Sequence, residues 1–142
     1  MKIAIACDHG GLQLKNAIIK YLTESGYEVR DFGTNTQDSC DYPDFGKLAA
    51  NAVSVGECER GIVVCTTGIG MSMVANKVKG VRCALCTSVD MAVMTRRHNN
   101  ANMIALGQKY VTVKLAKVIV DAFLNTEFEG GRHEVRVNKI EN

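Results

Sequence analysis

Two short segments carry side chains capable of acid–base chemistry beside glycine-rich turns. The first, Cys65-Thr66-Thr67-Gly68-Ile69-Gly70, places a thiol after an apolar run and before a helix-like stretch. The first turn of a helix offers unpaired N–H groups and positive partial charge, which favour a thiolate and can hold an oxyanion or a phosphate. A structural interpretation stands equally: Cys65 ends a hydrophobic strand and the glycines make a tight turn. The pattern alone leaves both open.

The second segment, Asp8-His9-Gly10-Gly11, puts a carboxylate and an imidazole in the equivalent place after the first apolar run. Taken alone, such a pair is more often a helix-capping Asp with a solvated His. Two other places share this ambiguity. His98 ends a predicted helix, where capping alone explains it, and Arg132 and Arg136 share one face if the tail is helical, usually a solvated one.

Three sharper motifs fail on the segment around Cys65. A dinucleotide-binding fingerprint needs a third glycine where Met73 stands, and no P-loop pattern is present. A cysteine phosphatase needs an arginine six residues beyond its nucleophile, but that position holds Met71. These chemistries are excluded.

The six cysteines favour free thiols in a cytoplasmic protein over a disulfide framework, because the chain is neither short nor dominated by loops. Cys83 and Cys86 have zinc-knuckle spacing, yet residues three apart on a strand point to opposite faces. With no second pair present, we expect no metal site.

Short apolar runs alternate with helical patterns along the whole chain. We predict strands at 3–7, 27–32, 61–65, 81–86 and 103–107, with 27–32 near a sheet edge. Helices are predicted after Gly11, through 47–53 with Pro43 in the first turn, after Gly70 to about 78, at 88–98 and at 112–124, while 127–142 adds at most one turn or helix. This alternation indicates an α/β fold: a three-layer α/β/α sandwich with a five-stranded parallel sheet, Rossmann-like. In such sheets ligands bind at the carboxyl ends of the strands.

Length and composition exclude several classes of function. The 142 residues predict a single domain spanning 1–142, and the mixture of 46% hydrophobic and 23% charged residues is ordinary for a globular protein. A net charge of +2 is too small for an electrostatic nucleic-acid binder, and no apolar stretch is long enough to span a membrane. Any anion recognised here is therefore small and locally contacted.

Together these segments resemble the type B ribose-5-phosphate isomerases, which are related to the galactose-6-phosphate isomerase subunits. The resemblance runs through nearly the whole chain, at residues 5–11, 41–43, 65–70, 75–77, 80–82, 97–102 and 129–133. It implies an isomerase of aldose and ketose phosphates that uses no metal or organic cofactor. It also implies a homodimer, or a dimer of two such dimers, whose partner chains share the active sites, with the tail at 127–142 contributing to the site or the interface.

The resemblance further implies a role for each candidate residue. Cys65 is similar to the family's base, which shuttles a proton through a cis-enediol(ate), and His98 to the acid that opens the sugar ring, with Asp8 assisting or binding hydroxyls. The backbone N–H groups of Thr67–Gly70 and the Thr67 hydroxyl would hold the enediolate oxygen. The remaining implied substrate contacts are Thr66, Gly68, Ile69 and Gly70 in the loop, His9, Arg132 and Arg136 at the phosphate, Asn99 at a hydroxyl, and Tyr42 beside the sugar.

Two residues depart from the family pattern. Thr66 stands where the family loop commonly has glycine, so a side chain there could narrow the pocket and change the preferred sugar. Lys109 stands where relatives often have an arginine; lysine keeps the charge but loses the bidentate fork.

We therefore expect interconversion of ribose 5-phosphate and ribulose 5-phosphate. A close alternative is a six-carbon substrate such as galactose or allose 6-phosphate. A sugar-phosphotransferase subunit carrying phosphocysteine on Cys7 or Cys65 is a more distant one, and a non-catalytic ligand-binding module is a third.

Overall fold

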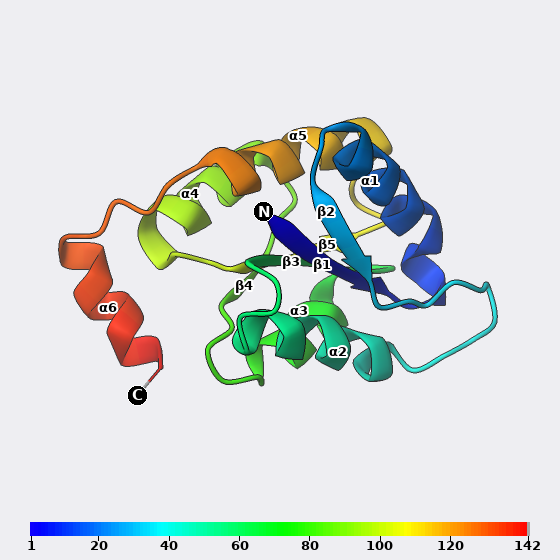
Figure 1. Ribbon diagram of the computed structural model, residues 1–142, viewed down its shortest axis with the longest axis horizontal. Helices are drawn as coiled ribbons and strands as arrows, with labels where there is room; N and C mark the ends of the chain where they lie inside the picture. The colour runs from blue at the N-terminus through cyan, green and yellow to red at the C-terminus, as the bar shows by residue number, and fades with distance from the viewer. Residues whose placement is uncertain (142) are drawn as a thin grey trace.

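The computed structural model describes residues 1–141, which form five strands and seven helical segments (Figure 1). The strands are β1 (Lys2–Cys7), β2 (Glu28–Asp31), β3 (Arg60–Cys65), β4 (Cys83–Leu85) and β5 (Met103–Gly107). The helices are the short 3₁₀ turn η1 (His9–Gly11), then α1 (Leu12–Glu24), α2 (Tyr42–Ser54), α3 (Ile69–Asn76), α4 (Val89–Asn99), α5 (Val113–Asn125) and α6 (Arg132–Ile140). None of the helices within this described part is long and apolar enough to cross a membrane.

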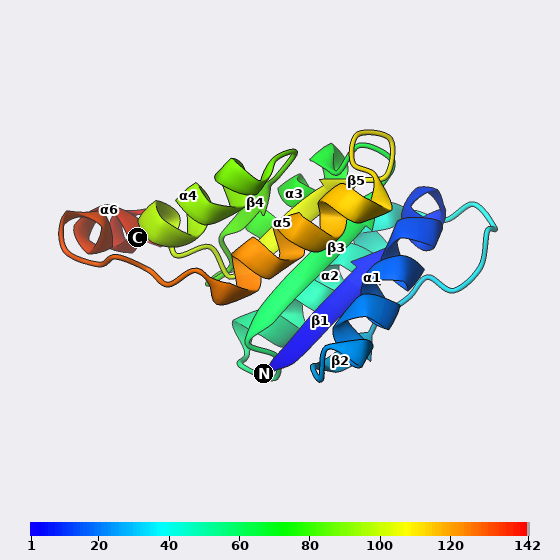
Figure 2. The ribbon, with the colours of Figure 1, turned by 90° about the horizontal axis from the view of Figure 1, so that it is seen from above.

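All strand pairs are parallel, and the sheet order is β2-β1-β3-β5-β4. Helices α1, α4 and α5 cover one face and α2 and α3 cover the other, which confirms the predicted three-layer α/β architecture (Figures 1 and 2). From β1 the chain moves outward to β2 and then returns to place β3 on the other side of β1. The carboxyl ends of β1 and β3 therefore flank the point where strand order reverses, where ligands bind in open α/β sheets.

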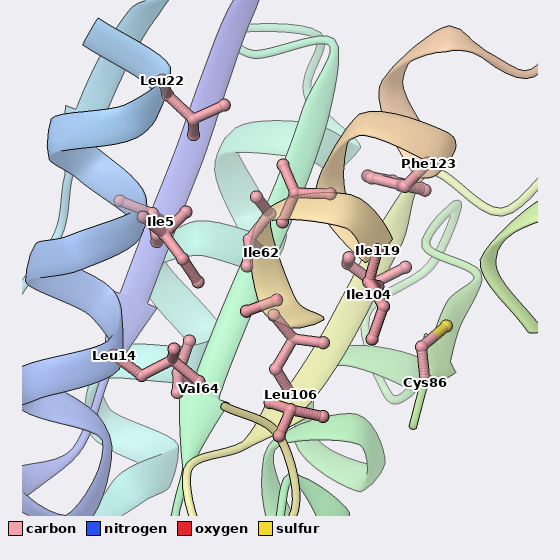
Figure 3. Close-up of a cluster of buried hydrophobic side chains, with 14 of the residues drawn as sticks. Ile5, Leu14, Leu22, Ile62, Val64, Cys86, Ile104, Leu106, Ile119 and Phe123 are labelled. Atoms are coloured by element: carbon pink, nitrogen blue, oxygen red, sulfur yellow. The ribbon is translucent and has the colours of Figure 1, made fainter. Parts of the chain in front are cut away.

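Side chains of the central strands alternate between two hydrophobic cores because successive residues of a strand point to opposite faces. In β1, Ile3 and Ile5 face α1 and α5, whereas Ala4 and Ala6 face α2. Figure 3 shows the first core, where strand side chains such as Ile62 and Ile104 meet Ile119 and Phe123 of α5. Strands buried on both faces explain why the sequence reads as continuous apolar runs rather than alternating ones.

The predicted strand at 81–86 is wrong in length, because only Cys83–Leu85 is a strand. Asparagine side chains replace strand partners there: the Asn76 amide bonds both the N–H and the carbonyl of Cys83, and Asn102 Oδ1 accepts from the Arg82 N–H. The opposed faces predicted for Cys83 and Cys86 are confirmed, since the two thiols lie in different cores.

Most helix boundaries follow the sequence signals closely. Ser88 caps α4 by accepting from the Met91 N–H at 3.2 Å, and Thr112 caps α5 at Leu115. Pro43 lies in the first turn of α2 as predicted. The tail forms a real helix, α6, which stands beside the end of α4 and away from the sheet (Figures 1 and 2).

Candidate active site

Cys65 is the last residue of β3 and lies against the first turn of α3. Its Sγ accepts a hydrogen bond from the Gly68 N–H at 3.1 Å, and its side chain is almost fully buried. Gly68 adopts a left-handed conformation, with φ +78°, and a Cβ there would lie 2.7 Å from Leu85 and 2.9 Å from the Leu106 backbone. Only glycine fits both the backbone angle and the available space. The hydrogen bond from this N–H to Cys65 Sγ therefore requires glycine at position 68.

Asp8 follows β1 at the neighbouring strand end. It is buried, its N–H donates to the Val64 carbonyl, and its carboxylate caps η1 by accepting from the Gly10 N–H at 2.9 Å. The capping interpretation of Asp8 is therefore correct. It does not exclude a second role, because one carboxylate can accept several hydrogen bonds.

His9 projects from η1 toward the loop before α2. Its Nδ1 accepts a hydrogen bond from the Cys40 N–H at 3.2 Å, which leaves Nε2 to carry the ring proton when the imidazole is neutral. The imidazole can thus present an N–H donor on the side away from the loop.

A cavity of about 430 Å³ opens between these strand ends. Seven predicted site residues line it, joined by one that sequence reasoning did not assign, Met73, which is 63% exposed. The predicted residues are Asp8, Tyr42, Cys65, Thr66, Thr67, Ile69 and Gly70.

Two close approaches shape the cavity wall. Thr66 Oγ1 lies at the position that a Cβ on Gly10 would take, so the threonine side chain packs on the η1 backbone. The Tyr42 ring lies over Gly70, where a Cβ would be 2.7 Å from the ring. The Thr67 hydroxyl accepts from the Ile69 N–H at 3.2 Å. Lys109 is adjacent, because its N–H donates to the Thr66 carbonyl.

Two other thiols, those of Cys7 and Cys86, are poorly placed for chemistry. Cys7 is fully buried, and burial raises its pKa to about 12 despite the nearby Lys15. Burial likewise raises the pKa of Cys86 to about 11. All six cysteines are free.

Four predicted site residues lie elsewhere in the chain: His98 and Asn99 at the end of α4, and Arg132 and Arg136 on α6. This group is tied to the amino end of β5, since Arg82 bonds the carbonyls of Asn99 and Asn100 as well as the Asn102 side chain. Cys65 instead pairs with Gly107 at the carboxyl end of β5. A five-residue strand separates its ends by roughly 13 Å. One chain therefore does not bring these four residues to the cavity.

His98 has partners that sequence reasoning did not assign. Its ring stacks on that of His133, with centroids 4.2 Å apart and planes at 13°, and both Nε2 atoms face Glu129 Oε1, at 3.8 Å from His98 and 3.5 Å from His133. Burial lowers the pKa of His133, helped by His98 and Arg132. These three side chains could hold a metal ion, but the lone pairs of two nearly parallel rings do not converge on one point.

Helix α6 is held at its far end by an ion pair. Arg82 Nη1 lies 2.7 Å from Glu141 Oε1, and the other carboxylate oxygen accepts from the Gly80 N–H. The same guanidinium bonds the carbonyls that end α4, so Arg82 joins the two helices that carry His98 and the arginines.

The chain is similar to known proteins along nearly its whole length. The family model described as Ribose/Galactose Isomerase matches residues 3–140. Ribose-5-phosphate isomerase B of Escherichia coli (strain K12) is 45% identical over 139 residues, covering 98% of this chain and 93% of that protein.

Two solved structures extend the similarity to the fold. Ribose-5-phosphate isomerase B of Clostridium thermocellum shares 56% identity with a TM-score of 0.98, covering 99% of this chain and 95% of that one. The Mycoplasma genitalium ribose-5-phosphate isomerase B, solved with bound ribulose-5-phosphate, shares 45% identity with a TM-score of 0.95, covering 99% and 93%.

Proposed function

The chain belongs to the ribose/galactose isomerase family, and from that premise we propose that it interconverts ribose 5-phosphate and ribulose 5-phosphate. The observation that carries the proposal is the position of the Cys65 thiol, which accepts from the Gly68 N–H and lines a cavity together with Asp8 and Thr67. Relatives at 45% and 56% identity, one of them solved with ribulose-5-phosphate, support the same substrate.

Cys65 is the proposed base. Its sulfur removes a proton from the carbon next to the carbonyl of the open-chain aldose and returns it one carbon away. The backbone N–H of Gly68 donates to this sulfur, and the other N–H groups of the first α3 turn can hold the enediolate oxygen. The reaction requires a group that moves a proton and a site that holds an oxyanion. The Cys65–Gly70 loop can supply both, through the thiol and the backbone N–H groups.

We propose that the site is completed by a second copy of the chain. The cavity holds the base, whereas His98, Asn99, Arg132 and Arg136 lie at the other end of the sheet. In a homodimer, the α4 and α6 helices of each chain can contact the cavity of the partner, which brings these four residues to the base. Exposed apolar side chains suited to such an interface occur on α3, α4 and α6: Ile69, Met73, Met91, Met94, Val135 and Ile140.

The phosphate is assigned to cations and donors from both chains. Arg132 and Arg136 are exposed and lie one turn apart on α6, so their guanidinium groups can converge on one anion. His9 and Lys109 would approach it from the cavity side. This gives the tail at 127–142 a binding role.

A phosphocysteine on Cys7 has little support, because Cys7 is fully buried and its pKa is raised to about 12. Six free thiols suit a reducing compartment, and we place the protein in the cytoplasm.

The experiment is an assay of purified protein on ribose 5-phosphate, allose 6-phosphate and galactose 6-phosphate, with Cys65→Ala as the inactive variant. The proposal predicts the highest kcat/KM on ribose 5-phosphate, and for Cys65→Ala a rate at least about 10²-fold lower with substrate affinity retained. Cys7→Ala serves as the matched control and should stay active. Normal turnover by Cys65→Ala would show that Cys65 is not the base. A higher kcat/KM on a hexose phosphate would show that ribose 5-phosphate is not the preferred substrate.

A further inference from the structure

The stacked rings of His98 and His133 form a unit distinct from the Cys65 cavity of the same chain. They come from different helices, α4 and α6, and lie almost parallel with centroids 4.2 Å apart. Their side chains differ in exposure, with His98 at 34% and His133 at 10%. The His98 ring is thus the more accessible one, and the more buried His133 ring packs against it.

The charges around the two rings oppose a positive charge on both rings at once. Two imidazolium rings in contact would repel each other, and one carboxylate, Glu129, faces both Nε2 atoms. Arg132 and Arg136 add positive charge near His133, and burial together with these cations lowers the pKa of His133. The neutral form of His133 is therefore favoured, and Glu129 Oε1 faces the Nε2 atom of each ring.

We propose that His133 and Glu129 are positioning residues for sugar-ring opening, and that the unit they form with His98 gives the protein a separable activity, the interconversion of the α and β anomers of ribose 5-phosphate. The inference rests on the proposed function, since it needs His98 to reach a bound furanose in the partner's cavity. Beyond the proposed function, it states that the sugar ring opens without any participation of Cys65.

The step balances without any further reagent. The bond between C1 and the ring oxygen breaks, the ring oxygen takes a proton from His98, and the C1 hydroxyl gives its proton to Asp8 while the C1 carbonyl forms. Closure on the other face of the carbonyl, by the reverse transfers, yields the other anomer. No atom of Cys65 takes part.

His133 acts through the orientation of His98. His98 is the second-to-last residue of α4, where a helix end frays, and the ring stack fixes the direction of its side chain. Helix α6 can provide that support because Glu141 ties its end to Arg82. A phenyl ring at 133 keeps the stack without any nitrogen, so it should replace the histidine, whereas a methyl group should not.

The test uses Cys65→Ala as the parent, so that isomerisation does not consume the substrate. Exchange between the anomeric protons of ribose 5-phosphate is measured by NMR magnetisation transfer, above the spontaneous rate. We expect the parent protein to accelerate the exchange. Adding His133→Ala or Glu129→Gln should slow it about tenfold or more, while His133→Phe should stay within about threefold of the parent.

Glu134→Gln is the matched control, because it makes the same chemical change at an exposed carboxylate on α6 and should leave the exchange rate unaltered. Thermal unfolding and ribose 5-phosphate binding report whether each variant is folded; if His133→Ala is not, His133→Phe and Glu129→Gln decide. The proposal is overturned if a folded His133→Ala or Glu129→Gln protein matches the parent, or if His133→Phe is as slow as His133→Ala. It also fails if the parent does not accelerate exchange although the wild-type protein isomerises ribose 5-phosphate. A wild-type protein with no isomerase activity would instead overturn the proposed function.

Discussion

The N–H of Gly68 donates a hydrogen bond to Cys65 Sγ at 3.1 Å, across the junction between the end of β3 and the start of α3. The contact depends on the left-handed backbone of Gly68, with φ +78°, and on the absence of a side chain facing Leu85 and Leu106. The hydrogen bond to the thiol and the packing of the loop therefore both depend on Gly68.

Gly68→Ala should both destabilise the protein and abolish isomerisation. An added methyl group would lie 2.7 Å from Leu85 in a strained backbone, so we expect a loss of at least about 2 kcal/mol in the free energy of unfolding. Gly56→Ala is the control, because Gly56 has φ +79° but open space around it and should cost about 1 kcal/mol with normal activity. Urea unfolding and a rate assay check both; equal behaviour of the two variants would contradict the packing argument.

Thr66→Gly should broaden the substrate range. The threonine side chain rests on the Gly10 backbone and occupies part of the cavity wall, so its removal makes room for a longer sugar. We expect the ratio of kcat/KM for allose 6-phosphate to that for ribose 5-phosphate to rise about tenfold. An unchanged or lower ratio would show that Thr66 does not limit sugar length.

Arg136→Ala should raise KM for ribose 5-phosphate by about tenfold or more, because a hydrogen bond to a charged group contributes roughly 1.5–3 kcal/mol. The fall in kcat should be smaller if the contact is equal in ground and transition states. Lys139→Ala removes another exposed cation of α6 and should change KM little. The assignment of Arg136 to the phosphate fails if its variant and the lysine variant behave alike.

Acid should destabilise the protein partly through His133. Burial, with His98 and Arg132, lowers the pKa of this residue in the folded state, so the unfolded chain takes up a proton at higher pH. Stability is then lost as the pH falls below the unfolded value of about 6.5 toward the lower folded value. His133→Phe removes this effect, and its thermal midpoint should fall less than that of the wild type between about pH 7.5 and 5.5. Parallel pH profiles would contradict this.

The alternation of apolar runs and helical patterns was sufficient to predict the fold, because each central strand is buried on both faces. Ile3 and Ile5 face one core while Ala4 and Ala6 face the other, and this leaves no polar position in the run. The edge strand β4 was harder to predict. Its ends depend on the side chains of Asn76 and Asn102, which come from other parts of the chain and leave no local pattern at Val81 or Arg82.

The loops at the strand ends were predictable for the same local reason. Asp8 and Cys65 directly follow apolar runs, and parallel strands bring such residues to one edge. Glu129 and His133 were not assigned a role, although their spacing of four residues was a usable signal. Their pairing with His98 depends on where α6 docks, which the end of α4 and the Arg82–Glu141 ion pair determine.

The central claim is that one active site takes Cys65 from one chain and Arg136 from the other, and mixed dimers test it most directly. Chains carrying Cys65→Ala and chains carrying Arg136→Ala would be co-expressed, and the rate measured at ribose 5-phosphate concentrations well below the KM of the Arg136→Ala homodimer. Random pairing gives half mixed dimers with one intact site each, so activity should return to about a quarter of the wild-type value. Activity no higher than the average of the two parent homodimers would place both residues in the site of a single chain and contradict the claim.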